Sequence, residues 1–368
     1  MNKRLKKNLA LVLSVTVGLG LLGGVLYYVG WRSILAQIYA LGFIGISAVI
    51  GTVLLTMLIW LASWSVILLS YGIKVPLRYI IGARLSGYAV TYTTPSLYSG
   101  GEPIRALLIT DHTPAPSTRI FATIIVERFL GALSLIFFVI GGGIYALLTS
   151  RVEAVAKEGV FIGIAFITFW IIVGLVNFTG NFKWASRLIG LLKRPFPRWE
   201  RGIGRAVDKV AETEDEIYDA FTRHWKGTFL AFLIQLVATF FVFIRPQVFF
   251  YFSSGRTFDF AQLSLLFTLN VMISFFLWIT PGGLGTGEAA LIGIFRLVGV
   301  GKEGAVAFSL AFKIVEFVLV AVGLFYLFHK GISRLLNRAK RRRQQRYALA
   351  EDRCAGDRCI EKGKRENN

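Results

Sequence analysis

Two glutamates, Glu102 and Glu288, stand in closely similar local sequences. Each follows a Thr-Pro pair and several glycines, and the distance from the threonine to the glutamate is the same in both stretches. The first stretch contains Thr94, Pro95, Gly100, Gly101 and Glu102, and the second contains Thr280, Pro281, Gly282, Gly283, Gly285 and Glu288. Each lies between two apolar segments, so we expect both carboxylates at membrane depth.

These residue types predict an interrupted helix at each position. Proline removes a backbone donor and glycine destabilises a helix. Broken backbone inside a membrane is tolerated only where protein buries it or where it lines a wet cavity. A carboxylate at that depth is costly and marks a candidate functional site. Two such breaks, in corresponding places of two halves, are typical of transporters with a central binding site.

Further charges follow each motif. Arg105 lies three residues after Glu102, on the same helix face. Twenty-five residues beyond each glutamate comes another charged group, which contains Glu127 and Arg128 in the first half and Lys313 and Glu316 in the second. Because charges inside a membrane must pair, we expect these side chains to approach the two motif glutamates near a common centre.

The residues leave several roles open for these charges. Glu102 and Arg105 either bind an anion together with the N–H groups of the second half-helix, or close a structural bend. Glu288 either acts on a substrate or caps its own helix. The later charges form a structural network, a substrate path or a proton path.

Other kinds of chemistry find little support in the sequence. The three histidines have no metal-ligand spacing, and no Ser/His/Asp set, phosphate-binding Lys-Ser/Thr loop or dinucleotide fingerprint is present. Cys354 and Cys359 lie in a charged tail without further ligands. We therefore expect no metal, no cofactor and no enzymatic activity.

The composition predicts an all-α integral membrane protein. Of the 368 residues, 55% are apolar, and several apolar runs are long enough to cross a bilayer. The net charge of +20 raises the alternative of nucleic-acid binding. The basic residues flank the apolar runs, however, which is typical of the positive-inside bias and of contact with anionic lipid. We expect no nucleic-acid partner.

The apolar runs predict about six spans and two re-entrant hairpins within a membrane domain of residues 1–330. The spans are expected at about 8–29, 43–71, 120–149, 160–179, 228–252 and 304–328. The helix-break-helix hairpins are expected at 79–110 and 260–298, and Arg245 is expected to reach the outer interface. Residues 30–40 are expected to form a short outer connection.

Flanking charges assign both termini to the cytoplasm in a cell membrane. Residues 181–227 are expected to form a cytoplasmic connector, with an interfacial helix at 183–199 and a solvated acidic helix at 208–223. A basic disordered tail follows at 331–368. Three full spans separate the hairpins, so the second must enter from the opposite face. Repeat one, about 43–149, and repeat two, about 228–328, are then inverted.

The motifs resemble those of a known family. The stretches at 94–105, 127–128 and 281–288 are similar to the membrane domain of lysylphosphatidylglycerol synthase and its stand-alone, flippase-like relatives. The resemblance covers about residues 8–330 and implies a member without the synthase domain. Lys313 stands where arginine is expected in many members. In the bifunctional synthases, this domain is thought to move aminoacylated phospholipid between leaflets.

The residues and the resemblance together predict a lipid translocator. Its substrate would be a phospholipid or a polyprenyl-phosphate lipid, with an anionic or phosphate head group bound between the hairpins. One alternative is a membrane-embedded transferase that uses a lipid-linked substrate. Another is a lipid-presenting partner of a separate lipid-modifying enzyme. The sequence specifies neither the lipid, the direction, the energy coupling nor the oligomeric state.

Overall fold

The computed structural model describes residues 16, 19–94, 100–149, 154–191, 200–277 and 280–329, and all regular structure in these ranges is helical. Five helical segments are long and apolar enough to cross a membrane. They are Gly42–Ser70, Ser117–Tyr145, Phe161–Gly180, Trp225–Ser254 and Lys302–His329. These segments confirm five of the six predicted spans. Of the first predicted span, only the end is described, as the helix Leu19–Val29.

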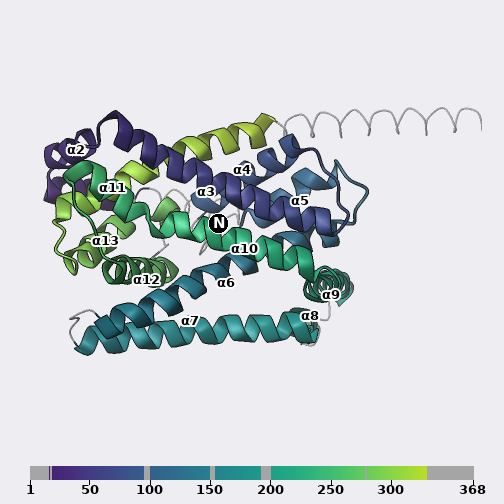
Figure 1. Ribbon diagram of the computed structural model, residues 1–368. Coiled ribbons are helices and arrows are strands. Elements are labelled where there is room, and N and C mark those ends of the chain that lie inside the picture. Colours follow the sequence, from purple (N-terminus) through teal and green to yellow (C-terminus); the bar gives the residue numbers. More distant parts are fainter. Residues whose placement is uncertain are drawn as a thin grey trace, which may run out of the picture.

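The long helices run along one axis and alternate in direction (Figure 1). They are α3 (Gly42–Ser70), α6 (Ser117–Thr149), α7 (Ala154–Gly180), α10 (Trp225–Phe243) with α11 (Arg245–Ser254), and the last described helix, Lys302–His329. A helix of 29 residues, such as α3, is about 44 Å long at 1.5 Å per residue. That length exceeds the hydrocarbon thickness of about 30 Å.

Two broken hairpins lie between the long helices. The first consists of α4 (Leu77–Thr93) and α5 (Glu102–Thr110). The second consists of α12 (Phe260–Leu277), the short 3-10 turn η2 (Pro281–Gly283) and α13 (Thr286–Arg296). In Figure 1, α4 and α5 lie toward the right end of the long helices, and α12 and α13 lie toward the left end. The hairpins therefore enter from opposite ends, as the odd number of intervening spans predicts.

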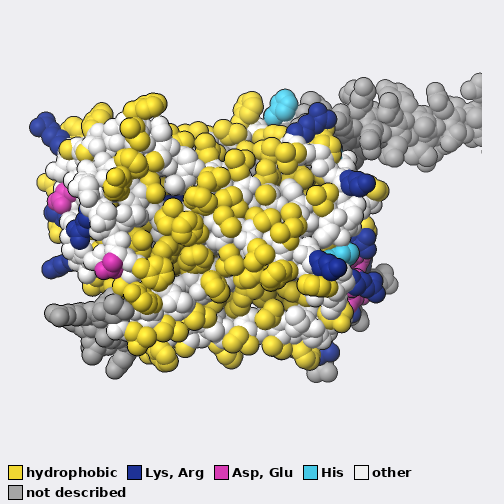
Figure 2. Space-filling view, viewed as in Figure 1, with side chains coloured by type: hydrophobic (Ala, Val, Ile, Leu, Met, Phe, Trp, Pro, Cys, Tyr) yellow, Lys and Arg dark blue, Asp and Glu magenta, His cyan; other side chains and the backbone are white. Residues whose placement is uncertain are grey.

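Helix packing holds the two halves together. α3 packs along α10, and α12 packs along α6. The last described helix approaches α4 so closely that a Cβ on Gly323 would overlap the carbonyl of Leu85, and Ser86 Oγ donates to the Gly323 carbonyl at 3.1 Å. The face of the bundle seen in Figure 2 is largely apolar, and most Lys and Arg side chains visible on it lie at its two ends. This distribution suits a protein surrounded by lipid.

The structure adds detail to two connections. The short connection at 30–40 is helical, because it contains α2 (Trp31–Tyr39), which bends by 83° from Leu19–Val29. The acidic segment is a helix, as predicted, and one of its faces is exposed. It belongs to α9 (Glu200–Thr222), whose other face packs on α6 and buries Ile217 and Ala220. Its amphipathic pattern, with one apolar face, explains this docking.

α9 also positions the short helix α8 (Trp184–Leu191). The Glu214 carboxylate accepts the backbone N–H groups of Ala185 and Ser186, at 2.9 and 3.2 Å. Partial burial alone would raise the pKa of the Asp215 carboxyl, but hydrogen bonds from Lys183 and Asn181 lower it below its usual value. α9 is therefore a support for α8.

Residues 192–199 of the predicted interfacial helix, the tail at 331–368, and Pro95 lie outside the described residues.

Candidate functional site

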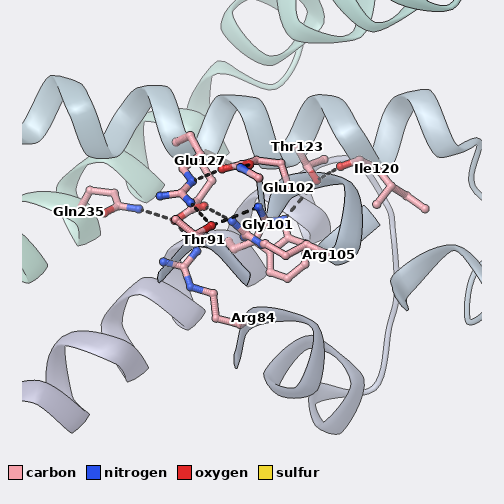
Figure 3. A network of polar contacts seen from close by, with 12 residues as sticks. Arg84, Thr91, Gly101, Glu102, Arg105, Ile120, Thr123, Glu127 and Gln235 are labelled. Carbon is pink, nitrogen blue, oxygen red and sulfur yellow. Dashed lines mark hydrogen bonds and ion pairs between the residues drawn. The ribbon is translucent and has the colours of Figure 1, made fainter. Parts of the chain in front are cut away.

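Glu102 holds the first break together (Figure 3). It is the first residue of α5, and its Oε2 accepts the backbone N–H of Gly100 at 2.8 Å. Its Oε1 lies 2.8 Å from Nε of Arg128, on α6. The adjacent Gly101 N–H donates to Thr91 Oγ1 at the end of α4, at 3.2 Å. The carboxylate therefore ties the backbone of the break to a neighbouring span.

Arg105 is not the partner of Glu102, although the two share a helix face. Its Nη1 lies 2.8 Å from Oε2 of Glu127 on α6. Glu127 also accepts from Arg84 at 2.8 Å and from Gln235 at 3.1 Å. Of the two alternatives for Glu102 and Arg105, a mutual pair that closes the bend is therefore not formed, because Glu102 pairs with Arg128 and Arg105 with Glu127, both on α6.

The Glu127 centre is buried. The Glu127 side chain is 3% exposed, and the guanidinium of Arg105 lies 4.0 Å from the ring centroid of Trp64. Burial raises the cost of any unpaired charge, so removal of Glu127 would leave two buried guanidinium groups without their carboxylate. Glu127 lies ten residues into α6, about 15 Å along its axis. Because the candidate span Ser117–Tyr145 has 29 residues and is about 44 Å long, Glu127 lies roughly a third of the way along it.

Glu288 repeats the arrangement in the second half. Its Oε2 accepts the Gly285 N–H at 2.7 Å, so Glu288 caps its own helix, which is one of the two alternatives that the sequence left open. Its Oε1 lies 2.6 Å from Nζ of Lys313 and accepts from Ser309 at 3.1 Å. Lys313 also donates to the Gly283 carbonyl at 3.0 Å. Lys313 therefore provides the positive charge that Arg128 provides in the first half.

The remaining predicted charge, Glu316, has a different partner. Its Oε1 lies 3.2 Å from Nη1 of Arg245, whose guanidinium also faces the ring of Phe312 at 5.2 Å. Arg245 is therefore directed to the partly buried Glu316 and not to the outer interface, because this acid is available nearby. The charges form three separate groups, centred on Glu102 with Glu127, on Glu288 and on Glu316. The sequence analysis predicted one common centre instead.

The two breaks nevertheless touch. The ring of Tyr92, at the end of α4, lies so close to Gly282 in η2 that a Cβ there would overlap it. Gly282 has a φ of 61°, which favours glycine as well. Tyr92 is buried and packs edge-on against Phe317 of the last described helix. Its neighbour Thr91 contacts the first break, so adjacent residues of α4 reach both breaks.

Several residues of the site escape sequence reasoning. Arg84, Thr91, Tyr92, Gln235 and Ser309 contact the motif residues but belong to no recognisable pattern. A lone arginine within the first hairpin is a signal that could have identified Arg84, since an intramembrane arginine requires a partner. The hydroxyl and amide residues carry no comparable signal. In the described part of the chain, no group of three His, Cys, Asp or Glu could hold a metal ion.

Replacement of Glu127 tests the buried centre. Glu127→Gln removes the countercharge of Arg84 and Arg105, so we expect it to destabilise the protein by about 3–5 kcal/mol, as for other broken buried pairs. Thermal unfolding in detergent measures the change. Asp219→Asn is the control, because its partner Arg223 is 78% exposed and such a pair contributes at most about 1 kcal/mol. Equal effects of the two changes would contradict this assignment.

A double-mutant cycle tests the second pair. Lys313→Met leaves the Glu288 carboxylate buried and unpaired, so we expect a large loss of thermal stability, whereas Lys313→Arg keeps the charge and costs less. Adding Glu288→Gln to Lys313→Met should recover part of the loss, because no buried charge then lacks a partner. Strictly additive effects of the single changes would show that the pair does not interact.

The comparisons identify the family. Residues 11–351 match the family described as lysylphosphatidylglycerol synthase TM region. The UPF0104 membrane protein PH1989 of Pyrococcus horikoshii is 24% identical over 334 residues, which cover 85% of this chain and 93% of the relative. A UPF0104 membrane protein of Methanothermobacter thermautotrophicus is 24% identical over 266 residues, covering 70% and 77%. No solved structure matches. This chain, an integral multi-pass membrane protein, belongs to the lysylphosphatidylglycerol synthase TM region family.

Proposed function

We propose that this protein moves a lipid with an anionic or phosphate head group between the leaflets of the membrane. The family in which this membrane region occurs is named for a lipid synthase, which favours a lipid substrate. The large apolar surface and the polar groups inside the bundle suit a molecule with acyl chains and a charged head. The lipid itself, the direction and a separate lipid-modifying partner are further parts of the proposal.

One observation supports transport above all: the two halves repeat one charged linkage in opposite orientations. In each half, the motif glutamate accepts an N–H of its own break and pairs with a cation on the following span. Lys313 lies eleven residues into the helix Lys302–His329, about 16 Å along its axis. The Glu288–Lys313 pair is therefore near the middle of this candidate span. Inverted hairpins that meet at the middle are the arrangement that alternating access requires.

The contact between the breaks suggests how access alternates. Tyr92 of the first hairpin packs on Gly282 of the second, so a shift of either break changes the packing of the other. The paired charges hold both breaks in the present arrangement. A head group that competes for these partners would loosen one hairpin and favour movement of the other. Such exchange needs no catalytic residue, in agreement with the expectation of a protein that is not an enzyme.

Reconstitution tests the proposal. Protein in liposomes with fluorescent phospholipids should make label in the inner leaflet accessible to a membrane-impermeant quencher, faster than protein-free liposomes do. The double variant Glu102→Gln/Glu288→Gln should lose most of this acceleration, because both breaks lose their ties. Glu212→Gln, on the exposed face of α9, is the control and should retain it. If no anionic phospholipid or polyprenyl phosphate moves with the unaltered protein, the proposal fails.

The proposed orientation places both termini in the cytoplasm. The chain has two cysteines, Cys354 and Cys359, both in the basic tail, so they report the side on which it lies. A membrane-impermeant maleimide should label them only after intact cells are permeabilised. Arg32→Cys in α2, which the proposal places outside, provides the control and should be labelled in intact cells. Labelling of the tail without permeabilisation would reverse the orientation.

A further inference from the structure

We propose that the Glu102 carboxylate occupies the place of a lipid phosphate at Arg128, and that the incoming phosphate displaces it. The inference deepens the proposed function and rests on it only for the view that the phosphate belongs to a transported lipid. A purely structural Glu102–Arg128 pair would stay closed, whereas the proposed role requires that a phosphate can replace the Glu102 carboxylate at Arg128.

The groups around Glu102 are those that bind phosphate. Arg128 Nε lies 2.8 Å from one carboxylate oxygen, and the Gly100 N–H donates to the other at 2.8 Å. Both oxygens lie at the start of α5, a nine-residue helix whose N-terminus favours an anion. Arg128 Nη2 also reaches the Thr91 hydroxyl at 3.4 Å. A guanidinium beside backbone N–H groups and a hydroxyl provides directional donors for phosphate oxygens.

The charges of this centre do not balance. Among the described residues, Arg84, Arg105 and Arg128 pair with two carboxylates, those of Glu102 and Glu127, which leaves one positive charge in excess. Nε and Nη2 of Arg105, whose side chain is 3% exposed, have no hydrogen-bond partner among the described residues. Excess buried charge is costly in a membrane. An anion that enters while Glu102 stays ionised nearby would therefore find a favourable potential.

Exposure distinguishes this pair from its counterpart in the second half. The Arg128 side chain is 38% exposed and that of Glu102 12%, whereas Lys313 is 12% exposed and Glu288 is fully buried. Glu288 has an additional donor in Ser309 and balances Lys313 one to one. The same linkage is thus open and positively charged in the first half, and closed and neutral in the second. We place the exchange in the first half alone.

Exchange would also act on the hairpin. Glu102 holds the Gly100 N–H and Arg128 at once, so its displacement releases the backbone of the break from α6. Phosphate binding and loosening of the first hairpin then become one event. The Tyr92–Gly282 contact would transmit this loosening to the second break.

Removal of the internal competitor tests the inference. Binding of dioctanoyl phosphatidic acid to the purified full-length protein in detergent is measured by titration, with dioctanoyl phosphatidylcholine and inorganic phosphate in parallel. Glu102→Gln should increase the affinity for phosphatidic acid by about tenfold or more, because a neutral amide competes poorly for arginine. Glu102→Asp, which keeps the charge at a shorter reach, should give an intermediate gain and remains informative if Glu102→Gln does not fold.

Matched variants define the site. Arg128→Gln should abolish the gain in the Glu102→Gln background, and Glu212→Gln, on the exposed face of α9, should leave the affinity unchanged. Unchanged or weaker binding in both Glu102 variants would overturn the inference. Equal binding of inorganic phosphate would overturn the assignment to a lipid head group, and equal binding of phosphatidylcholine would overturn the selectivity for an anion.

Transport in liposomes separates this inference from the proposed function. A gain in affinity without lipid movement would support the exchange at Arg128 and contradict the proposal that the protein translocates lipid. Lipid movement without a gain in affinity would support lipid translocation and contradict the exchange at Arg128.

Discussion

An ionised carboxylate inside a membrane needs a cation close by, and this requirement organises the whole bundle. Glu102 and Glu288 each lie at a break in a hairpin, where unpaired N–H groups also need an acceptor. Each glutamate meets both needs at once, through Gly100 and Arg128 in the first half and through Gly285 and Lys313 in the second. These pairs tie each hairpin to the long helix that follows it, where its carboxylate is neutralised.

The two halves share this linkage but differ in the charge around it. The first half adds Arg84, Arg105 and Glu127, which leaves an excess of positive charge close to a partly exposed arginine. The second half encloses a neutral Glu288–Lys313 pair. An inverted repeat therefore does not imply two equivalent binding sites. One half is suited to receive an anion, and the other to serve as a closed hinge.

Packing between the halves turns these local arrangements into one unit. α4 contacts the last described helix through the close approach at Gly323, and its end reaches both breaks through Thr91 and Tyr92. A small residue at each of these contacts lets backbone and ring approach closely. The two breaks are thereby in direct contact, through Tyr92 and Gly282.

The sequence alone predicted five spans that the structure describes, the two breaks and their opposite directions, because apolar length, Pro and Gly act locally and an odd number of spans separates the breaks. It also identified Glu102, Glu288 and the later charges as residues that must pair. Only the tertiary structure decided the partners: Arg128 for Glu102, Arg105 and Arg84 for Glu127, and Arg245 for Glu316. Those choices depend on the register in which distant helices pack, and no spacing along the chain encodes that register.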